Sequence, residues 1–225
     1  MIYLKNIKKN IKYQNPLEVD ELTFEKGKIY SVLGHNGSGK STLFKILYNI
    51  VDFDEGSIDI EGKGFSQEVV YQYMSYNPQK SYFLTGTLRD NFDYLYKYSK
   101  NSDLLGKTEL ESLIKEFNLE HRLDTNIKKL SGGEQAKAQF IRTLLMNKEY
   151  VLLDEPMASM DFKTIELVEE KLRELKSMNR SVILITHDFV QGNRVSDEIV
   201  FMENLKLIGK YKKDEFFKNK LFLSM

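Results

Sequence analysis

Short apolar runs alternate along this chain with longer stretches of helical periodicity. Apolar runs at residues 28–33, 150–153 and 181–185 end in glycine or polar residues, which is typical of buried strands. Between the last two runs, one helical stripe is apolar and the opposite side is charged. The stripe contains Ile165, Val168, Leu172 and Leu175, and the charged side contains Glu169, Glu170, Arg173 and Lys176. This strand–helix–strand order predicts a βαβ crossover in a parallel sheet.

The regions before and after the first buried strand have different patterns. Leu17, Val19, Leu22 and Phe24 roughly alternate with polar residues, which predicts half-exposed antiparallel strands near the N-terminus. Residues 81–146 are mainly helical in pattern, with predicted helices at 88–98, 108–117 and 134–146. We therefore expect one α/β domain over residues 1–225, with a mostly parallel sheet, an N-terminal antiparallel β subdomain and an inserted helical subdomain at about 81–146. The lysine-rich tail at 210–220 predicts a solvated terminal helix.

Composition narrows the possible functions. The 225 residues include 33 Lys+Arg, 33 Asp+Glu and no Cys, so a disulfide framework, a thiolate metal site and a Cys nucleophile are excluded. Zero net charge argues against a nucleic-acid partner, because phosphate-backbone affinity needs an excess of basic side chains. The apolar runs are too short for a transmembrane helix, and lysine interrupts the N-terminus before a signal-peptide core could form. We therefore expect a cytoplasmic protein.

A glycine-rich motif follows the first buried strand. Residues 34–41 read Gly-His-Asn-Gly-Ser-Gly-Lys-Ser, which matches G-x-x-x-x-G-K-[ST] between a predicted strand and a predicted helix. Such a loop directs backbone N–H groups and a helix N-terminus at phosphate oxygens. Lys40 would reach the β- and γ-phosphates, and Ser41 would supply a hydroxyl ligand to Mg²⁺. The sequence therefore predicts a P-loop NTPase core.

Two acids end the strand at 150–153. Asp154 and Glu155 lie at the carboxyl edge of a parallel sheet, where ligands bind in open α/β folds. Because consecutive strand residues face opposite ways, we expect two different roles for them. Asp154 is a candidate to hold Mg²⁺, and Glu155 is a candidate to orient or deprotonate a water that attacks the γ-phosphate.

A second glycine-rich helix start, Leu130-Ser131-Gly132-Gly133-Glu134, also offers a hydroxyl and free N–H groups to an anion. One nucleotide does not need two such sites from one chain. With these motifs the sequence resembles the ATP-binding cassette family, whose signature is Leu-Ser-Gly-Gly-Gln and whose subunits pair head to tail. Here Glu134 replaces the glutamine. The resemblance implies that Ser131 and Gly133 contact the γ-phosphate of ATP held by a second subunit.

Further matches follow in the order of that family. The resemblance implies that Tyr13 stacks on adenine, although Tyr3 or another aromatic could serve instead, and that Gln79 contacts Mg²⁺ or water. It also implies that Asp161 lies in the D-loop and that His187 is the switch histidine. The expected nucleotide-binding residues are Tyr13, Gly34, Asn36, Gly37, Ser38, Gly39, Lys40, Ser41, Thr42, Gln79, Ser131, Gly132, Gly133 and Asp161, with Glu155 and His187 catalytic and Ser41, Gln79 and Asp154 at the metal.

The resemblance also implies a function. It implies an ATPase that uses ATP and Mg²⁺, pairs with an identical or a different cassette subunit, and drives separately encoded transmembrane subunits from the inner face of the cell membrane. Residues 80–87 would then meet a membrane subunit, or Tyr82 and Phe83 would belong to the core. The alternatives are a soluble cassette ATPase in a non-transport process and a P-loop kinase or GTPase, of which the latter leaves residues 130–134 and His187 unexplained. Substrate and direction of transport stay open.

Overall fold

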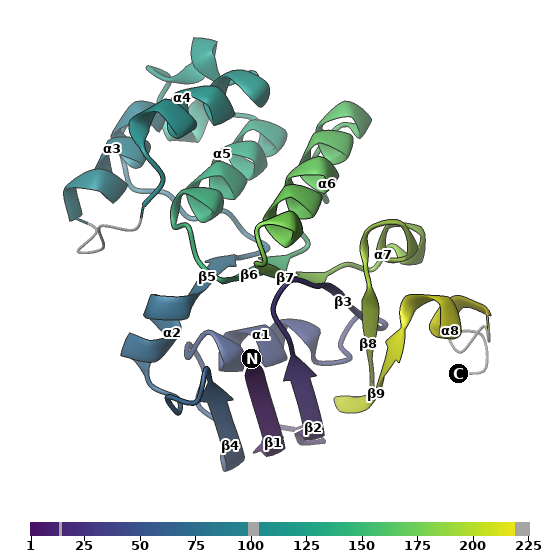
Figure 1. Ribbon diagram of the computed structural model, residues 1–225. Coiled ribbons are helices and arrows are strands. Elements are labelled where there is room, and N and C mark those ends of the chain that lie inside the picture. Colours follow the sequence, from purple (N-terminus) through teal and green to yellow (C-terminus); the bar gives the residue numbers. More distant parts are fainter. Residues whose placement is uncertain (14, 99–103, 219–225) are drawn as a thin grey trace.

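The computed structural model describes residues 1–13, 15–98 and 104–218. Among these residues, nine strands form one curled sheet in the order β4-β1-β2-β9-β8-β3-β7-β6-β5 (Figure 1). The strands are β1 (Ile2–Lys9), β2 (Leu17–Phe24), β3 (Ile29–Leu33), β4 (Glu55–Ile60), β5 (Met74–Asn77), β6 (Tyr150–Asp154), β7 (Ser181–Ile185), β8 (Glu198–Glu203) and β9 (Lys206–Lys212).

The sheet has a parallel part and an antiparallel part. Strands β8, β3, β7, β6 and β5 pair in parallel, and every residue of β3, β6 and β7 is buried. Strands β1, β2 and β4 pair antiparallel at the other end, as alternation in the N-terminal sequence predicts. The expected α/β fold, with its mostly parallel sheet and N-terminal antiparallel strands, is confirmed.

Helices cover both faces of this sheet (Figure 1). Helix α1 packs with β1, β2 and β4 in one apolar cluster, and α3 to α6 pack with the opposite face of β6 and β7 in another. No helix in the described part of the chain is long and apolar enough to cross a membrane. The helices are α1 (Lys40–Leu47), α2 (Gln67–Tyr73), α3 (Leu88–Tyr98), α4 (Lys107–Glu116), α5 (Gly132–Leu145), α6 (Phe162–Ser177), α7 (Phe189–Val195) and α8 (Lys213–Lys218), with 3₁₀ turns η1 (Glu120–Arg122) and η2 (Ile127–Lys129).

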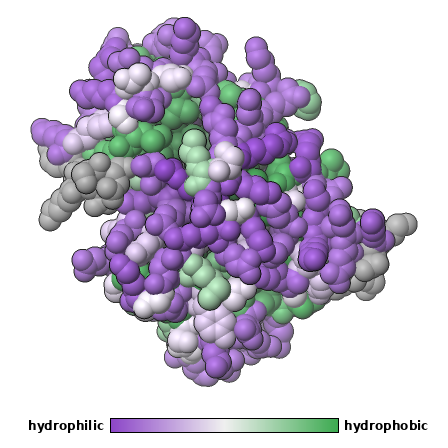
Figure 2. Space-filling view, in the orientation of Figure 1, coloured by the Kyte–Doolittle hydropathy of each residue, from purple (hydrophilic) through white to green (hydrophobic). Residues whose placement is uncertain are grey.

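The helices inserted between β5 and β6 form a separate layer beyond the β5 edge (Figure 1). Their apolar faces meet around Phe92, Leu113 and Phe140, as the helical periodicity predicts. In Figure 2 most of the visible surface is hydrophilic, and apolar side chains gather where α3, α4 and α5 meet. The insertion therefore has its own small apolar core, continuous with that of the sheet.

Two details differ from the sequence predictions. The prediction of a solvated helix at 210–220 is wrong at its start, because Lys206–Lys212 form strand β9 against β8. The described helix that follows, α8, buries Phe216 against Phe201. Glu169, which periodicity placed on the solvated side of its helix, is buried because Arg194 of α7 binds it through two nitrogens.

Candidate functional site

The phosphate loop connects the end of β3 to the start of α1 and depends on glycine at two places. A Cβ atom at Gly34 would lie 2.1 Å from the carbonyl oxygen of Met202, so only glycine fits beside β8. Gly39 has φ 98° and precedes α1, and as a glycine it has no side chain to cap the helix. The first N–H groups of α1 are therefore available to an anion at the helix N-terminus.

Lys40, the first residue of α1, folds back over this loop. Its Nζ donates to the carbonyl oxygens of Gly34 at 2.7 Å and His35 at 2.9 Å. Burial lowers the pKa of Lys40, and the charges of Glu155 and Asp154 oppose that shift. A buried cation whose hydrogen-bond partners are uncharged carbonyl and hydroxyl oxygens is well suited to bind an anionic phosphate.

Asp154 ends β6 directly beneath the loop. The Ser41 hydroxyl donates to its Oδ1 at 3.2 Å, and the Tyr76 hydroxyl donates to its Oδ2 at 3.4 Å. The carboxylate is 2% exposed, and burial raises the pKa of Asp154. A carboxylate beside a hydroxyl is the oxygen donor set that Mg²⁺ prefers, and a cation there would compensate the cost of burying the charge. The donors present therefore fit Mg²⁺.

Glu155 occupies the centre of the site. Its backbone has φ 48°, in the left-handed region, and its N–H donates to the carbonyl oxygen of Ile185 at the end of β7. Gln79 Nε2 donates to Glu155 Oε2 at 3.2 Å, and His187 Nδ1 lies 3.3 Å from Glu155 Oε1. Gln79 and His187, which are far apart in the sequence, thus converge on the carboxyl group of Glu155.

Part of the phosphate loop lines one open cavity of about 620 Å³ together with Glu155 and its two partners, whereas the buried Asp154 is not among the lining residues. The phosphate loop forms one wall, and Gln79, Glu155 and His187 form another. Ile11 and Leu205 add an apolar end that the sequence reading missed. No local sequence pattern marks either residue as part of the site. Leu205, for example, reaches the phosphate loop only through the β8–β9 hairpin. The full lining is Ile11, Asn36, Gly37, Gly39, Lys40, Ser41, Thr42, Gln79, Glu155, His187 and Leu205.

Tyr13, the expected adenine-stacking residue, does not line this cavity. Its side chain is 92% exposed, and Lys12 Nζ lies 5.1 Å from the centre of its ring. Ile11, two residues earlier, is the residue of this segment that lines the cavity. The structure thus leaves Tyr13 in solvent, outside the cavity that the phosphate loop, Glu155 and His187 line.

The 130–134 motif forms the N-terminus of α5. Ser131 Oγ accepts from the Glu134 N–H at 3.2 Å, and Glu134 Oε2 accepts from the Ser131 N–H at 2.8 Å, which makes a capping box. Arg122 Nε also donates to Glu134 Oε1 at 2.6 Å. The glutamate at this position therefore has a structural use, since it pairs with Arg122 as well as capping the helix.

The same segment borders a second, smaller cavity of about 180 Å³. Gly132 lines it together with Gln79 and Glu155, which also line the larger cavity. Ser131 and Gly133 are not among the described residues that line either of these two cavities. Asp161 caps α6 by accepting from the Thr164 N–H at 2.9 Å and lies 3.7 Å from Lys137 Nζ. These three residues lie outside the phosphate-loop cavity of their own chain.

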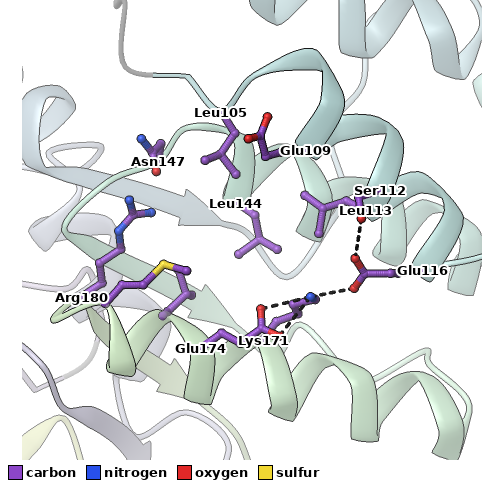
Figure 3. A pocket seen from close by; sticks show the side chains of 12 residues that line it. Leu105, Glu109, Ser112, Leu113, Glu116, Leu144, Asn147, Lys171, Glu174 and Arg180 are labelled. Carbon is purple, nitrogen blue, oxygen red and sulfur yellow. Dashed lines mark hydrogen bonds and ion pairs between the residues drawn. The ribbon is translucent and has the colours of Figure 1, made fainter.

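A further cavity, of about 220 Å³, separates α4 from α6 (Figure 3). Its inner wall is apolar, with Leu113 and Leu144 facing the space. At one side, Lys171 Nζ of α6 binds Glu116 of α4 at 2.7 Å and Glu174 at 3.1 Å. None of the motif residues lines this cavity, so we assign it to the packing of the inserted helices against the core.

Comparisons with known proteins agree with this geometry. A family model described as ABC transporter matches residues 17–158. The chain is similar to the tungstate uptake system ATP-binding protein TupC of Peptoclostridium acidaminophilum, with 34% identity over 206 residues, covering 90% of this chain and 94% of that protein. A solved ATP-binding subunit of an ABC transporter shares the fold with a TM-score of 0.84 at 22% identity, covering 98% and 93% of the two chains. So does the dimeric ATP-binding cassette MJ0796 in a post-hydrolysis state with ADP and Pi, with a TM-score of 0.78 at 22% identity, covering 95% and 99%.

Proposed function

The chain belongs to the ABC transporter family, and we propose that it hydrolyses ATP in the phosphate-loop cavity with Glu155 as the group that activates water. It is an ATP-binding, ATP-hydrolysing subunit of an ABC transporter. The observation that carries the residue assignment is the position of Glu155. It lies between Gln79 and His187 and lines the same cavity as the phosphate loop.

Each group around the cavity then has a distinct role. Lys40 and the N–H groups at the start of α1 bind the β- and γ-phosphates. Ser41 and Asp154, assisted by Gln79, would hold Mg²⁺, which would neutralise charge on the phosphate oxygens. Glu155 accepts a proton from the attacking water, and His187 stabilises the γ-phosphate from the other side. Gln79 and His187 fix the two oxygens of Glu155, so the base is oriented before the nucleotide binds.

A second cassette completes the site in this proposal. Ser131 and Gly133 lie outside their own chain's phosphate-loop cavity, so they are free to face the γ-phosphate of a partner. The solved MJ0796 cassette, whose fold this chain shares, is described as dimeric. The partner is either a second copy of this chain or a different cassette. Hydrolysis would release the two subunits, because only ATP bridges both motifs.

The chain would work at the membrane through other subunits. The tungstate system of P. acidaminophilum is named for uptake, and its ATP-binding protein is one of the relatives of this chain. We place this subunit in the cytoplasm, peripheral on the inner face of the cell membrane and bound to separately encoded transmembrane subunits. Tyr82 is 68% exposed just after Gln79 and offers an apolar contact for them, whereas Phe83 packs against the core. The alternative, a soluble cassette in a non-transport process, predicts no membrane partner on co-purification.

The assignment of Glu155 is tested by Glu155→Gln. The amide keeps the size and shape of the side chain but cannot accept the proton, so we expect turnover to fall by about 10²–10⁴-fold. ATP affinity, measured by titration calorimetry, should persist, and an ATP-dependent dimer should accumulate on size exclusion. Glu21→Gln, at an exposed position on β2, is the matched control. Unchanged turnover in Glu155→Gln would remove Glu155 from the catalytic role.

A further inference from the structure

Tyr76 lies on the same face of the sheet as Asp154. Strand β5 pairs in parallel with β6 and places Tyr76 opposite Leu152, two residues before Asp154. Opposite residues of a parallel pair, and residues two apart on one strand, point to the same side. The ring of Tyr76 packs between helix α1 and the sheet, with its centre 6.5 Å from that of Phe44 and 5.2 Å from that of Tyr48. Aromatic packing therefore fixes the direction of the Tyr76 hydroxyl.

That hydroxyl supplies one of two donors to the Asp154 carboxylate. Tyr76 donates to Oδ2 at 3.4 Å, and Ser41 donates to Oδ1 at 3.2 Å, so each oxygen has its own hydroxyl partner. Both distances are long for O–H···O hydrogen bonds, which leaves room for the carboxylate to shift by a few tenths of an ångström. The χ2 angle of an aspartate has a broad distribution, and a hydrogen-bond donor at each carboxylate oxygen restricts the range of χ2.

We propose that Tyr76 is a positioning residue that orients Asp154 for Mg²⁺. This inference rests on the proposed function, in which Asp154 and Ser41 hold the ion. With the Tyr76 hydroxyl on Oδ2, Oδ1 stays directed toward Ser41 and the phosphate loop. Phenylalanine at position 76 would fill the same space in the aromatic cluster and would lack the donor. The hydroxyl, and not the ring, is thus the part that the inference assigns to function.

The test measures metal-dependent nucleotide binding instead of turnover. A fluorescent ADP analogue is titrated into purified protein in EDTA and again across a series of free Mg²⁺ concentrations. Removing a partner of a metal ligand costs about 10–100-fold in metal affinity. Mg²⁺ should increase the affinity for the ADP analogue, and the free Mg²⁺ concentration that gives half of this increase is the quantity measured. Because the Tyr76 contact is long, we expect Tyr76→Phe to raise this concentration by about threefold to tenfold. The ADP affinity in EDTA and the thermal midpoint should not change.

Two further variants separate the possible outcomes. Tyr48→Phe removes a hydroxyl from the same aromatic cluster, and no contact of Tyr48 with Asp154 is recorded in the described structure, so its Mg²⁺ dependence should equal that of the unmodified protein. Asp154→Asn tests the proposed function itself and should abolish the Mg²⁺ effect. If Asp154→Asn abolishes it and Tyr76→Phe does not shift it, the inference about Tyr76 is wrong and the metal site stands. An equal shift in Tyr48→Phe would also overturn the inference, and an unchanged Asp154→Asn would overturn the metal assignment.

Discussion

At the scale of single residues, the backbone directs the two consecutive acids at the end of β6, Asp154 and Glu155, toward different partners. Asp154 ends the strand and faces Ser41 and Tyr76. Glu155 has φ 48°, which costs an ordinary residue about 1 kcal/mol, and its side chain meets Gln79 and His187 instead. Such a strained conformation at a functional site is maintained by its surroundings, here by the Glu155 N–H bonded to Ile185.

Lys40 provides the residue-scale prediction for nucleotide binding. In Lys40→Ala, the buried cation that we assign to the β- and γ-phosphates is missing, so ATP affinity should fall by about ten- to hundredfold. Titration calorimetry with ATP in EDTA and in Mg²⁺ measures this loss. Lys5→Ala, at an exposed position on β1, is the control and should bind ATP normally. Equal ATP affinities for the Lys40 and Lys5 variants would contradict the assignment.

The residues of the site differ in how far the sequence could predict them. Lys40, Ser41, Asp154 and Glu155 sit in local motifs next to strand ends, and their chemistry follows from that position. Ile11 and Leu205 enter the cavity from two separate loops, and Tyr13 points into solvent. Side-chain direction in a loop depends on contacts distant in sequence, which no local pattern encodes.

At the scale of elements, an ion pair that includes the buried Glu169 connects two helices, α6 and α7. The hydrophobic periodicity of each helix alone does not indicate this connection. Glu169 of α6 and Arg194 of α7 form a bidentate pair, and Arg173 adds a second cation at 3.4 Å. Helix α7 begins at the cap residue Asp188, directly after His187. The pair therefore fixes the helix that follows His187 against the helix that follows Asp161. Periodicity alone predicted a solvated Glu169, because it cannot anticipate a partner from another helix.

Glu61, just after β4, gives an element-scale prediction about acid stability. Burial alone would raise its pKa, but the N-terminal ammonium, the Tyr150 hydroxyl and Lys26 hold the pKa of Glu61 at about 2. Because this folded-state pKa lies below the usual 4.5, the stabilisation is present above about pH 4.5 and is lost as the pH falls toward 2. Glu61→Gln should lower the free energy of unfolding at pH 7 by about 1–2 kcal/mol after allowance for solvent screening.

Urea unfolding of Glu61→Gln at several pH values measures this effect. The difference from the unmodified protein should shrink between pH 4.5 and 2, since protonation of Glu61 removes the same interactions. Glu55→Gln, at an exposed position on β4, should show no such convergence. A constant difference across this pH range would show that Glu61 contributes through packing and not through its charge.

At the scale of the whole molecule, the residues that we propose for the site come from two parts of the fold. The parallel strands carry the phosphate loop, Asp154, Glu155 and His187, whereas the inserted helices carry Ser131 and Gly133. Within one chain, Ser131 and Gly133 do not line the phosphate-loop cavity. With 33 acidic and 33 basic side chains, two copies have little global repulsion to overcome when they associate.

Mixing two inactive variants tests head-to-tail pairing. Ser131→Asp keeps a good helix cap but adds a negative charge where we expect the partner's γ-phosphate, so it should abolish turnover on its own. Lys40→Ala should also be inactive. In an equal mixture, half of the dimers are hybrids with one intact composite site, so turnover should return to roughly a quarter of the unmodified level. Ser131→Asn is the control for the added charge, because asparagine has the shape of aspartate without its charge. A mixture of the two inactive variants that shows no turnover would contradict pairing in trans.

The sequence by itself indicated the buried parallel strands, the antiparallel N-terminal strands, the inserted helices, the phosphate loop, the two acids at the end of β6 and the family. These features are local, because they depend on periodicities of two and 3.6 residues and on glycine at positions next to a strand end. The tertiary structure decided that Glu155 meets both Gln79 and His187, that Tyr76 donates to Asp154, that Glu169 is buried, and that β9 replaces part of a terminal helix. Each of these depends on contacts between segments far apart in the chain, and such contacts are fixed only when the sheet assembles and the helices pack on it.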